Sequence, residues 1–216
     1  MKKGKLYNKT EFESSLNLNN IATHDFLIYF ISIFVYLDIL YRTMNRIFLI
    51  GYMGAGKTTA GRELAKELEM DFIDLDHFIQ ARYQKTVNQL FQEVGEAEFR
   101  NIERNMLKEV GEFENVVISS GGGTPCFFDN IEYMNQAGTT IYLKATPEAL
   151  SSRLNLCKDK RPLIKDKNED ELYKFVLDSL VKREPFYSKA KIIFETEELV
   201  TKEDVRKYVL QIIETL

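Results

Sequence analysis

A short stretch of this chain has the glycines, lysine and threonine of a phosphate-binding loop. The spacing G-x-x-x-x-G-K-[ST] is met by Gly51, Gly54, Gly56, Lys57 and Thr58. Glycines let backbone N–H groups turn toward a phosphate, because no Cβ stands in the way. In such loops the lysine reaches the β- and γ-phosphates of a nucleotide and the threonine hydroxyl faces Mg²⁺. The alternative is an ordinary glycine-rich turn that carries a surface lysine.

Two carboxylates follow a second apolar segment. Asp74 and Asp76 stand two apart in the hexapeptide DFIDLD, so both side chains point to the same side if the strand persists. Opposite a phosphate loop, one could hold Mg²⁺ through water and the other could accept a proton from a substrate hydroxyl. The alternative is that Asp76 only caps the helix that follows it.

Three consecutive glycines follow a third apolar segment. Gly121, Gly122 and Gly123 permit close approach to the backbone, and three in a row indicate that something lies against it. Ser119 and Ser120 precede them, at the place where a Mg²⁺-binding aspartate is conventional. This leaves Asp74 as the best-placed carboxylate if Mg²⁺ needs one from the protein.

Three arginines could neutralise anionic groups, although each also has a structural interpretation. Arg100 can pair with Glu103 at i, i+3, but the surrounding charge pattern is also typical of a solvated helix face. Arg161 lies in a charged loop, which could be a lid over a transferring phosphoryl group or an ordinary charged loop. Arg183 is expected to close a helix, where it could interact with the helix dipole alone.

The composition narrows the class of protein. The chain has 216 residues, 44% hydrophobic and 29% charged, which is typical of a soluble globular protein with one good-sized domain. Its net charge of −4 argues against a nucleic-acid binder that works through a basic surface. Cys126 and Cys157 have no metal-ligand spacing, so we expect free thiols in a reducing cytoplasm.

The order of the elements predicts where the polar motifs lie. Apolar strands are expected at residues 47–50, 71–76, 116–118, 139–143 and 191–194. Helices are expected around residues 60–68, from 76 to 83, at 86–94, from 95 to about 113, and at 131–136, 147–154, 169–183 and 202–215. This alternation predicts an α/β fold with a five-stranded parallel sheet, helices on both faces, and ligands at the carboxyl ends of the strands. The phosphate loop, the aspartate pair and the triple glycine should therefore meet at one crevice.

Taken together, the motifs resemble the shikimate kinase family. They are GYMGAGKTTAGRELA, DFIDLD, GEAEFRNIE, SSGGGTPC, KRPLI and KREPFY, in that order within residues 44–216. The resemblance implies a P-loop NTPase fold of the nucleoside-monophosphate-kinase type, with a substrate-binding segment at about residues 74–105 and a lid at about 157–168. It implies transfer of the ATP γ-phosphoryl group to the 3-hydroxyl of shikimate, in aromatic amino acid biosynthesis. It also implies a cytoplasmic monomer that uses Mg²⁺, with no nucleic-acid partner and no stable membrane association.

The resemblance assigns a nucleotide site. Its residues are Gly54, Ala55, Gly56, Lys57, Thr58, Thr59, Arg153 and Arg161. Lys57 and the lid residue Arg161 would act on the phosphates during transfer. Thr58 would bind Mg²⁺, and Asp74 would order it through water. Arg153 would stack on the adenine.

The resemblance also assigns a substrate site. Its residues are Asp76, Arg100, Gly122, Gly123 and Arg183. Asp76 would bind the shikimate hydroxyls and act as the base. Arg100, oriented by Glu103, and Arg183 would hold the carboxylate, since each guanidinium can grip a carboxylate in a forked manner. The backbone at the two glycines would support the ring hydroxyls.

Other functions remain as alternatives. A gluconate or nucleoside monophosphate kinase would share the fold, and the triple glycine with Arg100 and Arg183 argues against both. A GTPase-like switch would need N-K-x-D after a strand, which the sequence does not contain. A non-catalytic nucleotide-binding protein is disfavoured because every expected site residue is present.

The first 43 residues differ from the rest of the chain. An apolar run at residues 26–41 contains Asp38 and would span about 24 Å as a helix, short of the ~30 Å hydrocarbon core. No A-x-A cleavage site follows it. Because Met44 stands three residues before the first strand, we expect residues 1–43 to be an over-long start that is dispensable for folding and activity. A membrane-associating extension is the alternative.

Overall fold

Five short apolar segments form one parallel sheet in the computed structural model, which describes residues 46–158, 163–196 and 202–216. The strands are β1 (Arg46–Ile50), β2 (Asp71–Asp74), β3 (Val116–Ser119), β4 (Thr139–Lys144) and β5 (Ile192–Glu195). Their order in the sheet is β2-β3-β1-β4-β5, and every neighbouring pair is parallel. The predicted α/β fold with a five-stranded parallel sheet is therefore confirmed.

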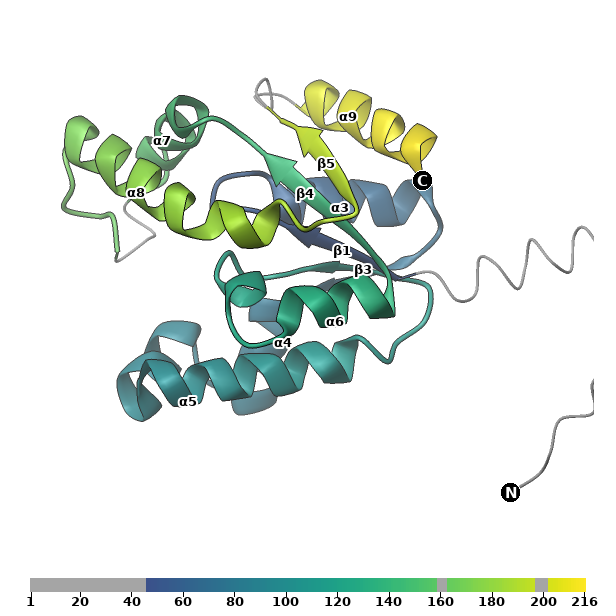
Figure 1. The fold of residues 1–216 in the computed structure, drawn as a ribbon, viewed down its shortest axis with the longest axis horizontal. Helices are drawn as coiled ribbons and strands as arrows, with labels where there is room; N and C mark the ends of the chain where they lie inside the picture. The colour runs from purple at the N-terminus through teal and green to yellow at the C-terminus, as the bar shows by residue number, and fades with distance from the viewer. Residues whose placement is uncertain (1–45, 159–162, 197–201) are drawn as a thin grey trace, which may run out of the picture. The chain divides into compact units, whose positions relative to one another are not determined.

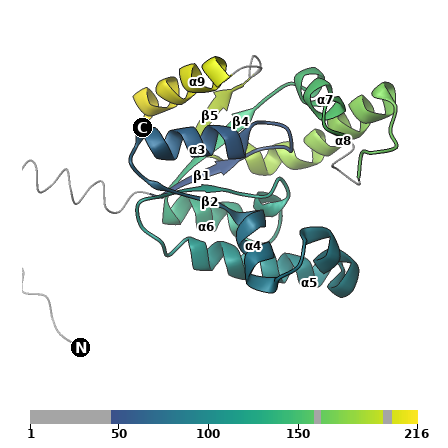
Figure 2. The ribbon, with the colours of Figure 1, turned by 180° about the vertical axis from the view of Figure 1, so that it is seen from behind.

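Helices cover both faces of this sheet. Figures 1 and 2 show α3 (Lys57–Glu67) and α9 (Lys202–Thr215) on one face, with α6 (Asn130–Ala137) and α8 (Glu169–Tyr187) on the other. The central strands β1 and β3 are almost entirely buried, whereas the edge strand β5 alternates between half-buried and exposed positions. This burial explains why the central strands read as continuous apolar runs.

The register brings the functional loops together. Ser119 of β3 pairs with Leu49 of β1 on one side and with Asp74 of β2 on the other. The carboxyl ends of β2, β3 and β1 therefore lie at the same level of the sheet. The phosphate loop after β1, the aspartates after β2 and the glycines after β3 leave the sheet at neighbouring positions.

The helices beside these loops begin and end at recognisable signals. α4 (Leu75–Tyr83) directly follows β2, and α7 (Pro147–Asn155) starts with proline at its first turn, as predicted. α5 (Val87–Val110) begins with a capping box between Thr86 and Gln89. It is broken at Gly95, whose φ of 78° separates the two predicted helical segments. α5 ends at Val110, three residues before the predicted end at about residue 113, and Phe113 beyond it is 42% exposed.

A second correction concerns the end of α8. The sequence predicts that this helix closes at Arg183, because Pro185 follows. The helix instead continues through the proline to Tyr187. A proline removes one backbone hydrogen bond, but the completely buried Tyr187 holds this last turn against the rest of the domain. Arg183 is therefore inside the helix rather than at its end.

Some predictions fall outside the described residues. They are those for residues 1–43 and for the lid arginine, Arg161, and they stay predictions. The compact unit Met44–Leu216 contains every element described above. Within the described ranges, no helix is both long and apolar enough to cross a membrane.

Candidate active site

The phosphate loop has a backbone that only glycine adopts readily. Gly51, Gly54 and Gly56 have φ angles of 138°, 85° and 89°, and α3 begins at the next residue, Lys57. These positive φ values are strained for other residues. The Lys57 ammonium donates hydrogen bonds to the carbonyl oxygens of Gly51 and Tyr52, at 2.8 and 3.1 Å. The loop thus holds its own cation at the N-terminus of a helix, where backbone N–H groups attract anions.

Asp74 connects the phosphate loop with the next strand. The Thr58 hydroxyl donates to its Oδ2 atom at 2.8 Å, and the backbone N–H of His77 donates to its Oδ1 atom at 3.3 Å. Asp74 is therefore the N-cap of α4. The alternative in which Asp76 caps this helix is wrong, because the strand ends at Asp74, two residues earlier than the sequence predicts. Asp76 lies in the first turn instead and remains available for another role.

The Asp76 carboxyl is in an environment that opposes its charge. Burial, followed by the nearby carboxylates of Asp74 and Glu103, raises its pKa from 3.8 to about 6. Lys57 and His77 act in the opposite direction but do not cancel these effects. A carboxylate with a pKa near the working pH accepts a proton more readily than an exposed aspartate does.

Asp76→Asn should raise the melting temperature of the ligand-free, metal-free protein at neutral pH. The pKa of Asp76 is about 6 in the folded protein, and its ordinary value is 3.8. The carboxyl group is therefore protonated in the folded and the unfolded protein at low pH, and charged in both at neutral pH. The charged form destabilises the fold by roughly 2–3 kcal/mol, since one pKa unit corresponds to about 1.4 kcal/mol. The extra stability of Asp76→Asn over the wild-type protein should therefore increase as the pH rises from about 4 to 6.

Thermal melts of both proteins across this range measure the difference. Asp71→Asn is the matched control, because Asp71 is exposed at the opposite end of the same strand. A difference for Asp76→Asn that does not change with pH would contradict the assignment of a raised pKa.

The triple glycine lies against four charged side chains of the protein itself. A Cβ built at Gly121 would lie 3.0 Å from Asp76 Oδ1 and 3.1 Å from Glu103 Oε1. At Gly122 it would lie 3.2 Å from Arg183 Nη1, and at Gly123 it would lie 3.0 Å from Arg100 Nη1 and Nη2. A side chain at any of these positions would have to displace its charged neighbour. The glycines thus let the two acids and the two arginines converge on this backbone.

Arg100 is held firmly from several sides. Its Nη1 atom pairs with Glu103 Oε2 at 2.8 Å, and its Nη2 atom lies 3.4 Å from Glu96 Oε1. The guanidinium carbon is 4.1 Å from the centre of the Phe127 ring. The Arg100 side chain is only 13% exposed and that of Glu103 only 2%. The interpretation as a solvated helix face is therefore wrong for Arg100 and Glu103, although Glu96 and Glu98 in the same segment are exposed.

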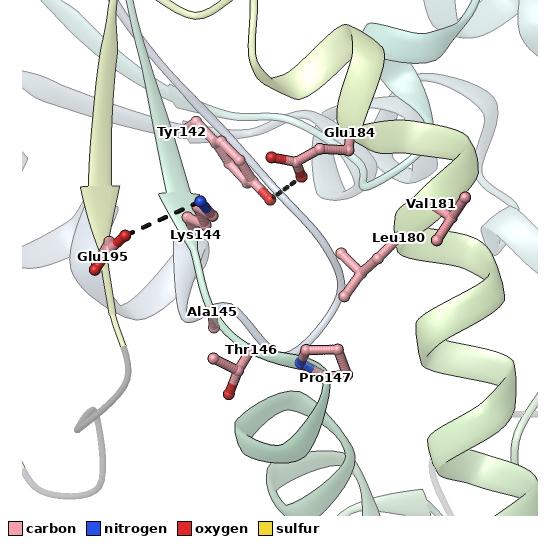
Figure 3. A pocket seen from close by; sticks show the side chains of 9 residues that line it. All are labelled: Tyr142, Lys144, Ala145, Thr146, Pro147, Leu180, Val181, Glu184 and Glu195. Carbon is pink, nitrogen blue, oxygen red and sulfur yellow. Dashed lines mark hydrogen bonds and ion pairs between the residues drawn. The ribbon is translucent and has the colours of Figure 1, made fainter.

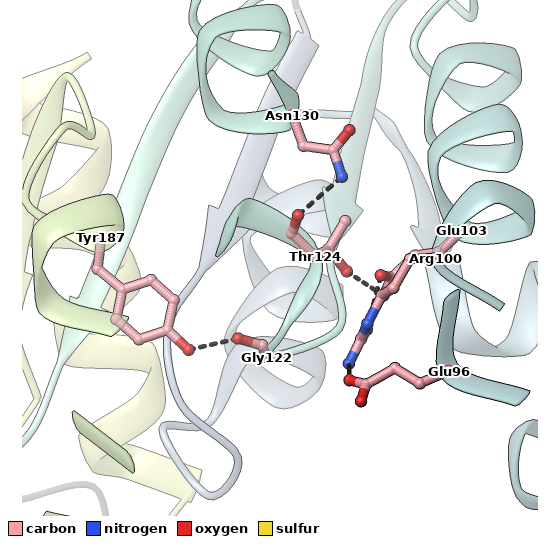
Figure 4. A network of polar contacts seen from close by, with 7 residues as sticks. All are labelled: Glu96, Arg100, Glu103, Gly122, Thr124, Asn130 and Tyr187. Carbon is pink, nitrogen blue, oxygen red and sulfur yellow. Dashed lines mark hydrogen bonds and ion pairs between the residues drawn. The ribbon is translucent and has the colours of Figure 1, made fainter. Parts of the chain in front are cut away.

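The glycine loop is tied to the arginines by residues to which the sequence assigned no role. The Thr124 hydroxyl donates to Glu103 Oε1 at 2.6 Å, and the Asn130 side chain donates to the Thr124 carbonyl at 2.8 Å (Figure 4). On the other side, the Tyr187 hydroxyl donates to the Gly122 carbonyl. Thr124 and Tyr187 occur in SSGGGTPC and KREPFY, so the motifs contained them, but only the tertiary structure gives their partners.

A crevice of about 360 Å³ runs along the phosphate loop. The predicted site residues that line it are Gly54, Gly56, Lys57, Thr58, Thr59, Asp74, Asp76, Gly122 and Arg153. Arg153 donates to the carbonyl oxygens of Gly54, at 3.4 Å, and Thr196. Arg100 and Arg183 do not line this crevice but lie against the adjoining glycines. The structure thus places a phosphate-binding end next to an end with two arginines.

The cysteines take no visible part in this chemistry. Both are free thiols, as the sequence predicts. Burial raises the pKa of Cys126 to about 11 despite the nearby Arg183 and Arg100, so this thiol stays protonated. Cys157 lines the crevice, and its thiol contacts the Arg153 carbonyl.

Comparisons with known proteins agree with this geometry. The family model described as shikimate kinase matches residues 53–214. A shikimate kinase of Parabacteroides distasonis is 59% identical over 162 residues, which cover 75% of this chain and 94% of that protein. A crystal structure of shikimate kinase from Bacteroides thetaiotaomicron matches with a TM-score of 0.74 at 50% identity, over 79% of this chain and 97% of that one. The enzyme of Acinetobacter baumannii in complex with shikimate matches with a TM-score of 0.70 at 32% identity, over 82% and 97%.

Proposed function

Because this chain belongs to the shikimate kinase family, whose members transfer the γ-phosphoryl group of ATP to the 3-hydroxyl of shikimate, we propose that its active site is the crevice at the phosphate loop. Lys57 lies at the phosphate end of this crevice and Asp76 faces the glycine loop. The acceptor hydroxyl would be placed between them. Phosphoryl transfer needs little covalent help from a protein, so positioning and charge neutralisation carry most of the catalysis.

Asp76 is the group that takes the proton in this mechanism. As the shikimate oxygen bonds to the γ-phosphorus, the bond from phosphorus to the β,γ-bridging oxygen breaks and ADP leaves. The hydroxyl proton passes to the Asp76 carboxylate, whose raised pKa suits a base at neutral pH. Lys57 neutralises the charge on the phosphoryl oxygens, and Arg161 is proposed to do so from the lid.

Thr58 and Asp74 suit a magnesium ion. Mg²⁺ prefers hard oxygen ligands and retains several waters, and the Thr58 hydroxyl and Asp74 carboxylate bring two such oxygens together at the crevice. When bound, the ion would neutralise charge on the nucleotide phosphates. We propose that Thr58 contacts it directly and that Asp74 holds it through water. Arg153 is proposed to stack on the adenine.

The observation that carries the proposal is the convergence of charged side chains on the triple glycine: Asp76 lies against Gly121, Arg183 against Gly122 and Arg100 against Gly123. A carboxylate substrate with several hydroxyls could bind both arginines while its ring lies on the glycine backbone. ADP release from MgATP, measured with shikimate, gluconate and nucleoside monophosphates in turn, tests the proposal. Release that depends on shikimate alone is expected, and an equal response to another acceptor would overturn it.

Arg183→Ala and Arg100→Ala should each weaken shikimate binding far more than ATP binding. Loss of a charge-assisted contact is worth roughly 1.5–3 kcal/mol, or about 10- to 150-fold in the dissociation constant. Arg100→Ala should also lower the melting temperature, because it leaves the buried Glu103 carboxylate without its cation. Isothermal titration of each variant with both ligands gives the two affinities.

Arg104→Ala is the control for this pair of variants. Arg104 lies one turn further along α5, where it pairs with Asp129 and packs on Phe128. It resembles Arg100 in its partners but does not face the glycine loop in the described contacts. If both Arg100→Ala and Arg183→Ala bind shikimate like Arg104→Ala, the proposed carboxylate site is wrong.

A further inference from the structure

The Tyr187 phenol links helix α8 to the glycine loop of the proposed substrate site. Its hydroxyl donates to the Gly122 carbonyl (Figure 4). A Cβ built at that same glycine would lie 3.2 Å from Nη1 of Arg183, one turn earlier than Tyr187 on α8. The Tyr187 side chain is completely buried, so its position is determined by packing. One phenol therefore joins the glycine loop to the helix that carries an arginine of the site.

The remainder of the glycine loop is anchored independently. Thr124 binds Glu103, which in turn pairs with Arg100, and Asn130 binds the Thr124 carbonyl. These contacts fix the loop relative to α5 and α6. Within the described residues, the hydrogen bond from the Tyr187 hydroxyl is the only one found between the Gly122 carbonyl and α8. This hydrogen bond therefore helps to hold Gly122 in place beside Arg183, whose guanidinium carbon also lies 5.0 Å from the centre of the Tyr52 ring.

We propose that Tyr187 is a positioning residue for the acceptor substrate, which holds Arg183 and the Gly122 backbone in the arrangement that receives shikimate. This inference rests on the proposed function, because it takes Arg183 as a ligand of the substrate carboxylate. Tyr187 itself touches neither the nucleotide end of the crevice nor the predicted base in the described contacts. Its effect should therefore be confined to the acceptor substrate.

Tyr187→Phe is the direct test, since it keeps the buried ring and removes only the hydroxyl. The KM and dissociation constant for shikimate should rise roughly fivefold or more, as expected for the loss of one hydrogen bond that orders a site. The KM for ATP should stay within about twofold of the wild-type value, a difference too small to represent a hydrogen bond. A purely structural residue would not separate the two substrates in this way.

Tyr142→Phe is the matched control. The Tyr142 ring packs on that of Tyr187 with centroids 5.0 Å apart, and its hydroxyl donates to Glu184 Oε2 at 2.8 Å (Figure 3). It is equally buried and also loses one hydrogen bond, but that bond does not involve the glycine loop. Both variants should lose similar amounts of thermal stability, and only Tyr187→Phe should raise the KM for shikimate.

Gly122→Ala disturbs the arrangement of Gly122 and Arg183 directly and serves if Tyr187→Phe does not fold. Its Cβ would lie 3.2 Å from Arg183 Nη1, so the shikimate KM should rise while the phenol is intact. The proposal fails if Tyr187→Phe changes the KM for shikimate no more than Tyr142→Phe does. If Tyr187→Phe does not fold, the proposal fails when Gly122→Ala leaves the KM for shikimate unchanged. An unchanged shikimate affinity in Arg183→Ala, measured in parallel, would instead overturn the proposed carboxylate site itself.

Discussion

Lys57→Ala should reduce kcat at least about a hundredfold, the scale observed when one preorganised electrostatic group is removed from an active site. The Lys57 ammonium lies over the phosphate loop, held by the carbonyl oxygens of Gly51 and Tyr52. It is the cation that would meet the γ-phosphoryl group as negative charge shifts during transfer. Without it, the helix N-terminus and backbone N–H groups would still bind the nucleotide, so the loss should appear in turnover more than in the KM for ATP.

Lys66→Ala is the control for this substitution. Lys66 lies on the same helix, but it is 72% exposed and pairs only with Glu63 in the described contacts. Steady-state kinetics and thermal melts on the same samples separate lost catalysis from lost folding. Near-normal turnover by folded Lys57→Ala protein would show that this loop does not hold the transferred group.

Asp76→Asn should lower kcat about a hundredfold or more while the protein stays folded. The amide has nearly the shape of the carboxyl group but cannot accept the hydroxyl proton, and general bases commonly contribute ~10²–10⁴-fold. The fold should survive because Asp74, not Asp76, caps α4. The same variant should also be more stable at neutral pH, since it removes a buried charge. A variant that is more stable and less active is the combination expected of a catalytic group held in an unfavourable environment.

A rate measurement and a melt on one preparation test both parts of this prediction. Asp71→Asn again provides the control, because it changes an exposed carboxylate on the same strand. Full activity in Asp76→Asn would assign Asp76 a structural role and remove the proposed base. A large loss of stability would show instead that the carboxylate is needed for folding.

The sequence by itself determined the fold and the strand–loop–helix position of the proposed nucleotide site. The reason is that this information is local: the glycines, Lys57 and Thr58 follow a buried strand and start a helix within a few residues. Strand and helix periodicity then placed the aspartates and the triple glycine at strand ends. In a parallel sheet those ends meet at one edge.

Boundaries were less well determined, because helix ends depend on contacts with distant residues. Pro185 indicates the end of a helix locally, but the packing of Tyr187 carries α8 past it. The apolar pattern of DFIDLD extends to Asp76, but the chain turns into α4 at Asp74. In both cases the tertiary environment overrode a local preference.

Only the tertiary structure decided how the substrate end of the site is assembled. The i, i+3 spacing of Arg100 and Glu103 is the same on a solvated face as in a core, and burial appears only when Phe127 and Thr124 pack against them. The raised pKa of Asp76 likewise comes first from burial, and in part from Glu103, which is remote in sequence. The motif KREPFY contains Tyr187 without indicating that its hydroxyl reaches a glycine 65 positions away. Burial and long-range hydrogen bonds arise from the packing of separate segments, so no local pattern of residues could specify them.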